Sequence, residues 1–248
     1  MGLRSAGKTR TRSGTARRNR KPRIPDRKPC RVAARQPVKE GQNPRPSGRG
    51  ARQFLTGRSP ASRDRAMRLI GGDLVVGPLA PGEHDPLRHY AAATATDEWL
   101  VLGNGEQASQ VAERLRGGAS ATDALSGLQY EPDPPIRTSR ITALISRDGG
   151  RATVFGAARP SRAARLTSNV MTLAVQDLEP GEAVLLTTYT SDGELVSVAA
   201  PFTETTVKAD DAEELLNEIW SALDERFRIA ATVIDPVQGP SSAIQRSS

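Results

Sequence analysis

The chain has 248 residues, of which 37% are apolar and 4% aromatic, and a formal net charge of +7 at pH 7. These proportions allow one moderate hydrophobic core. The sequence has no run of eighteen apolar residues and no apolar signal-peptide segment, so we expect no membrane span and a cytoplasmic location. The single cysteine, Cys30, excludes an internal disulfide and a thiolate zinc site.

The positive charge is concentrated at the start of the chain. Residues 1–50 hold 16 Lys and Arg against 2 Asp and Glu, whereas residues 51–248 hold 19 against 26. Residues 1–53 also lack aromatic residues and a periodic apolar face. We therefore expect a disordered basic extension over residues 1–53, a folded domain over residues 54–235 and a disordered tail over residues 236–248.

The basic extension has two possible uses besides that of a solvated tail. It could bind nucleic-acid phosphates, or it could serve as an Arg-rich targeting segment. No amphipathic period and no aromatic stacking residue supports either use, so a solvated extension is the default interpretation.

The folded domain is predicted to begin with a short strand at Phe54, followed by a turn with Arg58 at its tip. Three further arginines follow in a polar stretch, at Arg63, Arg65 and Arg68. Arginines grouped at a turn can recognise a phosphate ester through paired hydrogen bonds, and a solvated turn residue is the alternative for Arg58.

A strand over residues 73–76 is followed by a long loop over residues 77–88, a length that is often functional. Tyr90 lies where this loop meets the next strand, and it is either a half-buried strand residue or a hydroxyl presented to a ligand. The two histidines, His84 and His89, lie on or beside the loop. We expect them to be exposed or hydrogen-bonded and expect no metal site.

At the centre of the chain a strand over residues 99–102 is predicted to turn sharply at Gly103–Gly105 into a helix. The spacing Gly103-x-Gly105-x-x-Ala108 matches a dinucleotide fingerprint. However, Asp123 falls inside a second helical pattern instead of ending a parallel strand. A glycine turn needed only for positive φ is the simpler interpretation.

The second helical pattern covers residues 122–128, with Ser120 as its cap, and ends before the Pro-rich bend 132–135. Polar side chains therefore gather at two chain turns. Asn104 and Glu106 lie at the first, and Tyr130, Glu131 and Asp133 lie at the second.

The second half of the chain alternates apolar runs with turn signals, which indicates an antiparallel sheet. The predicted strands cover residues 140–146, 152–157, 166–175, 183–190, 195–199 and 229–234. An amphipathic helix over residues 210–226 is expected to pack on this sheet. The result is a layered α+β domain.

Several ordered motifs run through the predicted domain. They are Phe54-Leu-Thr-Gly-Arg58, Gly82-Glu-His-Asp-Pro-Leu-Arg-His-Tyr90, the Asn104-Gly turn, and Tyr130-Glu131-x-Asp133 followed by Thr138-x-Arg140-Ile. Together, up to about Ile234, they resemble the inosine monophosphate (IMP) cyclohydrolase family of archaea and some bacteria. Members of this family usually begin with a strand, a turn and a second strand leading into the Phe54 segment, and here the basic extension stands in that place.

The resemblance implies a four-layer αββα fold with mostly antiparallel sheets, as in N-terminal-nucleophile (Ntn) hydrolases. Those hydrolases use a Cys, Ser or Thr at a processed N-terminus. Nothing near Met1 and Gly2 suggests such a residue, so we expect no autoprocessing.

The resemblance also implies a reaction. It is the dehydrating closure of 5-formamidoimidazole-4-carboxamide ribonucleotide (FAICAR) to IMP, which needs neither cofactor nor metal. Glu131 corresponds to the family's proton-transferring glutamate, and Tyr90 and Arg58 correspond to the residues that polarise the formyl group. Asn104 and Arg140 would hold the base or the ribose phosphate.

Two other functional hypotheses stay open. One is a non-catalytic nucleotide-binding relic, motivated by the missing first hairpin, in which Tyr130 and Glu131 form a packed loop and Asn104 a plain turn residue. The other is a nucleic-acid-binding protein that acts through its basic tail. The expected partner of the domain itself is a small molecule, with a homo-oligomer possible and no membrane.

Overall fold

The computed structural model describes residues 31–34, 50–57, 59–80, 84–134, 136–161, 166–176, 178–179, 181–188 and 202–248. Within these residues the chain forms two antiparallel sheets and four α-helices. The expected α+β class, dominated by antiparallel sheet, is confirmed.

The larger sheet is a meander in which every strand pairs with the next along the chain. Its seven strands are β3 (Arg65–Ile70), β4 (Asp73–Pro78), β5 (Tyr90–Ala95), β6 (Trp99–Gly103), β7 (Arg140–Ser146), β8 (Thr153–Arg159) and β9 (Asn169–Val175). The turn between β7 and β8 contains Gly149 at φ 72°, which is the tight hairpin that its Asp-Gly sequence predicts.

The smaller sheet combines strands from both ends of the chain, in the order β11-β10-β1-β2-β12-β13. Its strands are β1 (Arg31–Ala34), β2 (Ala51–Thr56), β10 (Glu182–Thr187), β11 (Phe202–Thr206), β12 (Arg228–Ile234) and β13 (Ile244–Ser247). All of its described pairs are antiparallel.

The described part of the chain forms four α-helices and one 3₁₀ helix. They are α1 (Pro60–Arg63), α2 (Gln107–Arg116), α3 (Ala121–Leu125), α4 (Ala212–Ala222) and the 3₁₀ helix η1 (Gly239–Ser242). The Ser120 hydroxyl accepts from the Asp123 amide at 3.1 Å, which confirms the predicted cap of α3. Asp211 caps α4 in the same way, at 2.8 Å from the Glu214 amide.

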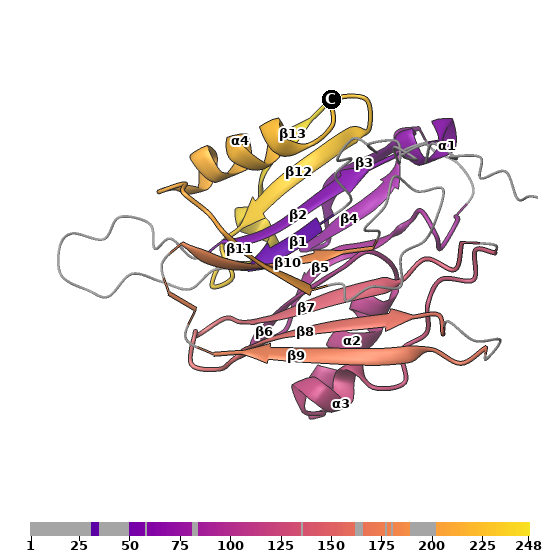
Figure 1. The fold of residues 1–248 in the computed structure, drawn as a ribbon, viewed down its shortest axis with the longest axis vertical. Coiled ribbons are helices and arrows are strands. Elements are labelled where there is room, and N and C mark those ends of the chain that lie inside the picture. Colours follow the sequence, from indigo (N-terminus) through magenta and orange to yellow (C-terminus); the bar gives the residue numbers. More distant parts are fainter. Residues whose placement is uncertain are drawn as a thin grey trace, which may run out of the picture.

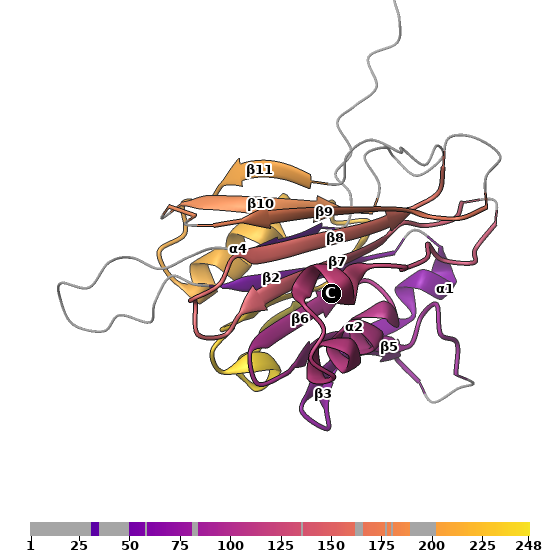
Figure 2. The same cartoon turned by 90° about the horizontal axis from the view of Figure 1, so that it is seen from below.

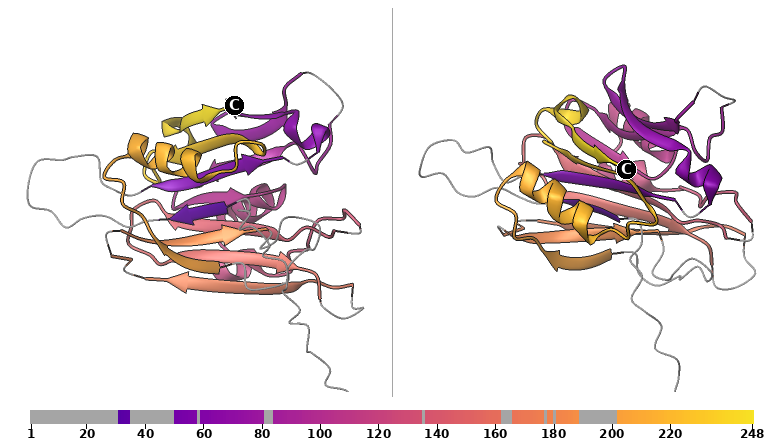
Figure 3. Two further views of the ribbon diagram at one scale, coloured as in Figure 1. Left: turned by 45° about the horizontal axis from the view of Figure 1, so that its top comes forward. Right: turned by 90° about the horizontal axis from the view of Figure 1, so that it is seen from above.

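Three apolar clusters hold the sheets and helices together. One lies between the two sheets, a second joins α2 and α3 to the larger sheet, and a third joins α4 to the smaller sheet. Figure 1 shows α4 above the smaller sheet and α2 and α3 on the far side of the larger one. Figure 2 shows α2 in front of the larger sheet when the molecule is seen from below, and Figure 3 shows α4 lying across its sheet.

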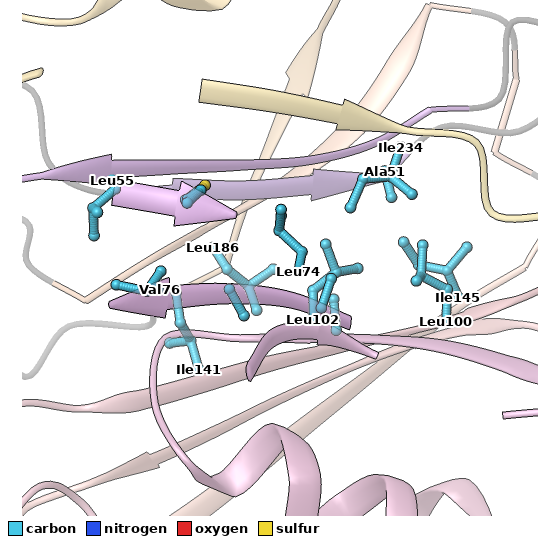
Figure 4. Packing of buried hydrophobic residues seen from close by; sticks show 14 of the residues in the cluster. Ala51, Leu55, Leu74, Val76, Leu100, Leu102, Ile141, Ile145, Leu186 and Ile234 are labelled. Atoms are coloured by element: carbon cyan, nitrogen blue, oxygen red, sulfur yellow. The ribbon is translucent and has the colours of Figure 1, made fainter. Parts of the chain in front are cut away.

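The central cluster follows from the alternation of side chains along each strand (Figure 4). In β2, Ala51 and Leu55 belong to this cluster, whereas Phe54 belongs to the cluster under α4. Leu100 and Leu102 of β6 reach the centre, and Val101 between them contacts the α2 side. Each sheet thus has two covered faces.

In the described residues, the structure corrects part of the predicted N-terminal extension and the predicted C-terminal tail. Within residues 1–53, Arg31–Ala34 forms β1, and β2 already begins at Ala51. Because β1 lies between β10 and β2, it satisfies backbone groups that would otherwise be unpaired in the middle of the sheet. The antiparallel pair β1 and β2 also corrects the expectation of a missing first hairpin.

The predicted C-terminal tail, residues 236–248, is also ordered. It contains η1 and then β13, which pairs with residues 230–233 of β12. The Ser248 amide donates to the Ile229 carbonyl at 3.0 Å. This segment is ordered by main-chain pairing with β12. A short polar sequence such as Ile244–Ser247 gives little indication of such pairing.

Two further differences concern single elements. The polar stretch with Arg65 and Arg68 forms β3, an edge strand where long charged side chains are common. The predicted strand over residues 195–199 lies outside the described residues.

We expect Gly57→Ala to destabilise the fold. An added Cβ would lie 2.6 Å from the Ser62 carbonyl oxygen and 2.7 Å from Ile229 Cδ1, while the Gly57 amide donates to Phe227 O at 2.8 Å. The free energy of unfolding, measured in urea, should fall by about 1–3 kcal/mol. Gly77→Ala is the control because its Cβ would meet no atom within 4 Å. Equal stability of the two variants would contradict this packing.

Candidate functional site

The antiparallel pairing of β6 with β7 brings the two predicted chain turns together. Gly103, at the end of β6, pairs with Thr142 near the start of β7. The β6–α2 turn therefore lies beside the loop that leads into β7. Because β6 is antiparallel to both of its neighbours, the sheet lacks the parallel strand pair that a dinucleotide fingerprint requires.

The first turn has glycine at two positions because a Cβ atom would not fit there, and not because these positions need a positive φ. Neither Gly103 nor Gly105 has a positive φ, which corrects the prediction for this turn, and Asn104 is not in that region either. A Cβ at Gly103 would meet the Ala108 Cβ at 3.0 Å, and one at Gly105 would meet Gln107 Oε1 at 2.7 Å. The glycines let the turn approach the helix and β7 closely.

The Asn104 side chain fastens the first turn to β7. Its amide nitrogen donates to Ser139 O at 2.9 Å, and its oxygen accepts from the Ile141 amide at 2.8 Å. Gln107 Nε2 also donates to the Asn104 oxygen at 3.0 Å and to the Ile141 carbonyl at 3.0 Å. In this structure Asn104 thus acts mainly as a clamp next to Arg140.

The loop of the second turn folds Glu131 back toward the sheet. The Glu131 amide donates to Thr138 O at 2.8 Å, which closes the loop. The Asp133 carboxylate accepts from the Thr138 amide at 2.7 Å and from its hydroxyl at 2.5 Å. Arg137 completes the turn at φ 53°, an uncommon conformation for a residue with a side chain. Asp133 therefore acts as the support of this loop.

Glu131 is a buried carboxyl group, with 9% of its surface exposed. Burial raises the pKa of Glu131 from its ordinary 4.5 to about 8; Asp133 also raises it, Arg140 and Arg65 lower it, and Glu106 raises it slightly. No hydrogen bond or ion pair reaches its carboxyl from the rest of the described chain. Glu131 therefore carries a proton at neutral pH and can donate it.

Arg140 lies at the start of β7 with 8% of its surface exposed. Its Nη2 forms an ion pair with Glu106 Oε1 at 3.1 Å, while its Nε is buried and has no hydrogen-bond partner in the described part of the chain. A Cβ at Gly105 would lie 3.7 Å from this Nε and 3.5 Å from Glu131 Oε1. Glu131, Arg140 and Gln107 thus converge on the face of Gly105.

Of the five site residues predicted from the sequence, the structure brings Asn104, Glu131 and Arg140 together. Tyr90 begins β5 at the same end of the sheet, is 8% exposed and packs into the central cluster. Arg58 lies outside the described residues. Arg65, which sequence analysis took for a phosphate-binding candidate, donates to Ser62 O at 2.8 Å and to Thr56 O at 3.4 Å.

Two site residues were missed from the sequence. Gln107 is fully buried at the start of α2, and its Oε1 has no hydrogen-bond partner among the described residues. A polar residue four positions before Val111, on the apolar face of α2, is the signal that could have found it. Gln53 lies in β2 and donates to Gly103 O at 2.6 Å across the two sheets, a contact with no local sequence signal.

A separate hollow of about 140 Å³ lies between α4 and the smaller sheet, lined by residues such as Phe54, Val207 and Ile219. It is on the outer side of that sheet, away from Glu131. In the described part of the chain, no group of three or more His, Cys, Asp or Glu side chains could hold a metal ion. No described helix is long and apolar enough to cross a membrane.

Comparison with known proteins gives two matches. The model of a family described as IMP cyclohydrolase-like protein matches residues 43–237. An IMP cyclohydrolase of Methanothrix thermoacetophila is 28% identical over 136 residues, which is 52% of this chain and 62% of the relative. The chain thus matches less than two thirds of that relative's length.

Glu131→Gln should change how stability depends on pH. The folded chain binds the Glu131 proton more tightly than the unfolded chain, so this group makes the free energy of unfolding fall as pH rises from 4.5 to about 8. The slope from one such group is about 1.4 kcal/mol per pH unit. Glutamine does not titrate, so the variant should gain stability relative to the unmutated chain as pH rises from 4.5 to about 8. Urea unfolding at several pH values measures this difference. If the free energy of unfolding depended on pH in the same way in both chains, the raised pKa of Glu131 would be ruled out.

Proposed function

The chain belongs to the IMP cyclohydrolase-like family, and we propose that it closes the second purine ring of FAICAR to give IMP and water. In this reaction the carboxamide nitrogen attacks the formyl carbon of the same molecule. A C–N bond forms as this nitrogen loses a proton, and the formyl oxygen takes up a proton and becomes a hydroxyl. The hydroxyl then leaves as water as the former formamide nitrogen loses its proton and the ring C=N bond forms. The matched relative is named an IMP cyclohydrolase, which supports an enzyme of this type.

The observation that carries the proposal is the buried Glu131 carboxyl, whose pKa burial raises to about 8. An intramolecular attack depends on positioning and on control of charge at the reacting carbon. As the nitrogen attacks, the formyl oxygen gains negative charge, and a neutral carboxylic acid held in a dry site can protonate it. The raised pKa of Glu131, about 8, gives this acid form at neutral pH.

The other site residues have roles that fit their positions. Arg140, with a buried Nε donor, would stabilise negative charge on the ligand or on Glu131 after proton transfer. Tyr90 and Arg58 would polarise the formyl group, as the family resemblance implies. Asn104 would act by fixing the turn beside Arg140, in addition to the substrate contact expected from the sequence. This set of roles requires no cofactor.

We also propose that the order of layers corresponds to the αββα arrangement of Ntn hydrolases. The positions of α4 and of α2 and α3 on the outer faces of the two sheets support it. In this proposal the fold is used without an N-terminal nucleophile, since the proposed chemistry centres on Glu131 and Arg140. The protein would act in the cytoplasm on a small nucleotide, and association into a homo-oligomer is compatible with this role.

The direct test is to incubate the purified chain with FAICAR and follow IMP formation by absorbance. We expect turnover, with kcat/KM falling as pH rises through about 8, because Glu131 then loses its proton. Binding of FAICAR or IMP without turnover would instead support the non-catalytic relic. Retention on nucleic acid that depends on salt and on residues 1–50 would support the third hypothesis.

Glu131→Gln keeps the size of the side chain and loses the transferable proton. We expect kcat to fall by about 10²- to 10⁴-fold with little change in KM, and the alkaline limb of the pH profile to disappear. Glu113→Gln removes an exposed carboxylate from α2 and is the control, with unchanged kinetics expected. Full turnover by Glu131→Gln would refute the assignment of this residue.

A further inference from the structure

Two carboxyl groups lie near the Arg140 guanidinium, and only one of them pairs with it. Glu106 Oε1 is 3.1 Å from Arg140 Nη2, whereas no ion pair joins Arg140 to Glu131 in the described structure. Arg140 Nε nevertheless faces the Gly105 position that Glu131 Oε1 also approaches, and it has no hydrogen-bond partner among the described residues. The guanidinium is therefore turned toward the carboxyl of the first chain turn.

The difference in burial between Glu106 and Glu131 explains why Arg140 pairs with Glu106. The Glu106 side chain is 45% exposed and that of Arg140 is 9% exposed, so the ion pair lies at the edge of the site, where water still stabilises the Glu106 carboxylate. Glu106 also directly precedes α2, and the positive end of the helix dipole favours a carboxylate there. Ionised Glu131 would lack the stabilisation by water, because it is buried.

We propose that Glu106 is a positioning residue that holds the Arg140 guanidinium away from Glu131, so that Glu131 keeps its proton in the free site. The structural part of this inference stands without the proposed function. Its catalytic consequence rests on the proposed function, since an acid at Glu131 is useful only for a reaction that takes up a proton.

In the part of the chain that the structure describes, four charged groups from different elements influence Glu131. They are Asp133 on its own loop, Arg140 at the start of β7, Arg65 at the start of β3 and Glu106 before α2. Asp133 is held by Thr138, and Arg65 is held by the carbonyl oxygens of Ser62 and Thr56. Of the two arginines in this group, Arg140 is the one that is paired with a side chain in the described structure. Glu106 is that partner.

Proton transfer to the substrate leaves a negative charge on Glu131. The O–H bond of Glu131 breaks as an O–H bond forms at the former formyl oxygen, so Glu131 becomes a carboxylate. The buried Nε donor of Arg140 faces the same Gly105 position as Glu131 Oε1, and it would stabilise that new charge after the proton has moved. Glu106 would thus prevent Arg140 from ionising Glu131 before the proton has moved.

Glu106→Gln tests the inference because it keeps the side-chain shape and removes the charge. Arg140 should then turn toward Glu131, and a nearby negative charge is also lost, so both changes favour the Glu131 carboxylate. The midpoint of the Glu131 titration, followed by NMR of ¹³C-labelled Glu carboxyls and assigned with Glu131→Gln, should fall by at least about half a pH unit. The alkaline limb of kcat/KM should move down by the same amount.

Two comparison variants make the result specific. Glu113→Gln removes a charge from the same helix without touching Arg140 and should leave the midpoint in place. Glu106→Asp keeps the charge on a shorter side chain and should move the midpoint less than Glu106→Gln does. Thermal unfolding checks that each variant is folded, which the half-exposed position of Glu106 favours.

The two readouts separate the possible failures. A midpoint of Glu131 that is the same in Glu106→Gln as in the unmutated chain would overturn the inference, whatever the activity. A lowered midpoint in a chain that closes no ring would uphold the role of Glu106 and reject the proposed function. A kinetic defect with an unmoved pH limb would identify Glu106 as a substrate contact and also overturn the inference.

Discussion

The pairing of β6 with β7 is the constraint on which the candidate site depends. This antiparallel ladder sets the end of one strand against the start of the other, so that residues 103–106 and 131–140 become neighbours. Asn104 then locks the first turn to the backbone of β7 with two hydrogen bonds, and Gln107 adds a third contact from within the helix. Without this register, Glu131 and Arg140 would not share one face of Gly105.

Burial gives the site its chemical character. Desolvation is the largest influence on Glu131, and it outweighs two arginines that act in the opposite direction. Both arginines lower the pKa of Glu131, but each also has another partner, which is a backbone carbonyl oxygen for Arg65 and Glu106 for Arg140. A site with two guanidinium groups nearby can therefore still contain a neutral carboxylic acid at pH 7.

Local patterns in the sequence predict most of the fold correctly, because apolar alternation, glycine turns and helix caps act over a few residues. The β7–β8 hairpin, the Ser120 cap and the amphipathic α4 are examples. Elements that depend on partners far along the chain were missed. The polar strand β13 forms through pairing with β12, and the position of β1 is set by β2 and β10.

In the candidate site, too, local features could be predicted from the sequence and long-range contacts could not. The two polar turns were visible in the sequence, and the family resemblance singled out Asn104, Glu131 and Arg140 among their residues. The clamp role of Asn104, the buried Gln107 and the Glu106–Arg140 ion pair depend on contacts across 3 to 37 positions of the chain. The spacing of residues in the sequence does not predict which carboxyl group pairs with an arginine, because the pairing depends on the burial of each group.

A crystal structure of the chain with bound IMP tests the central claim most directly. The account predicts that the purine base lies against the β6–α2 turn at Gly105, with the Glu131 carboxyl and the Arg140 guanidinium within hydrogen-bonding distance of it. IMP bound elsewhere, for example in the hollow between α4 and the smaller sheet, would contradict it.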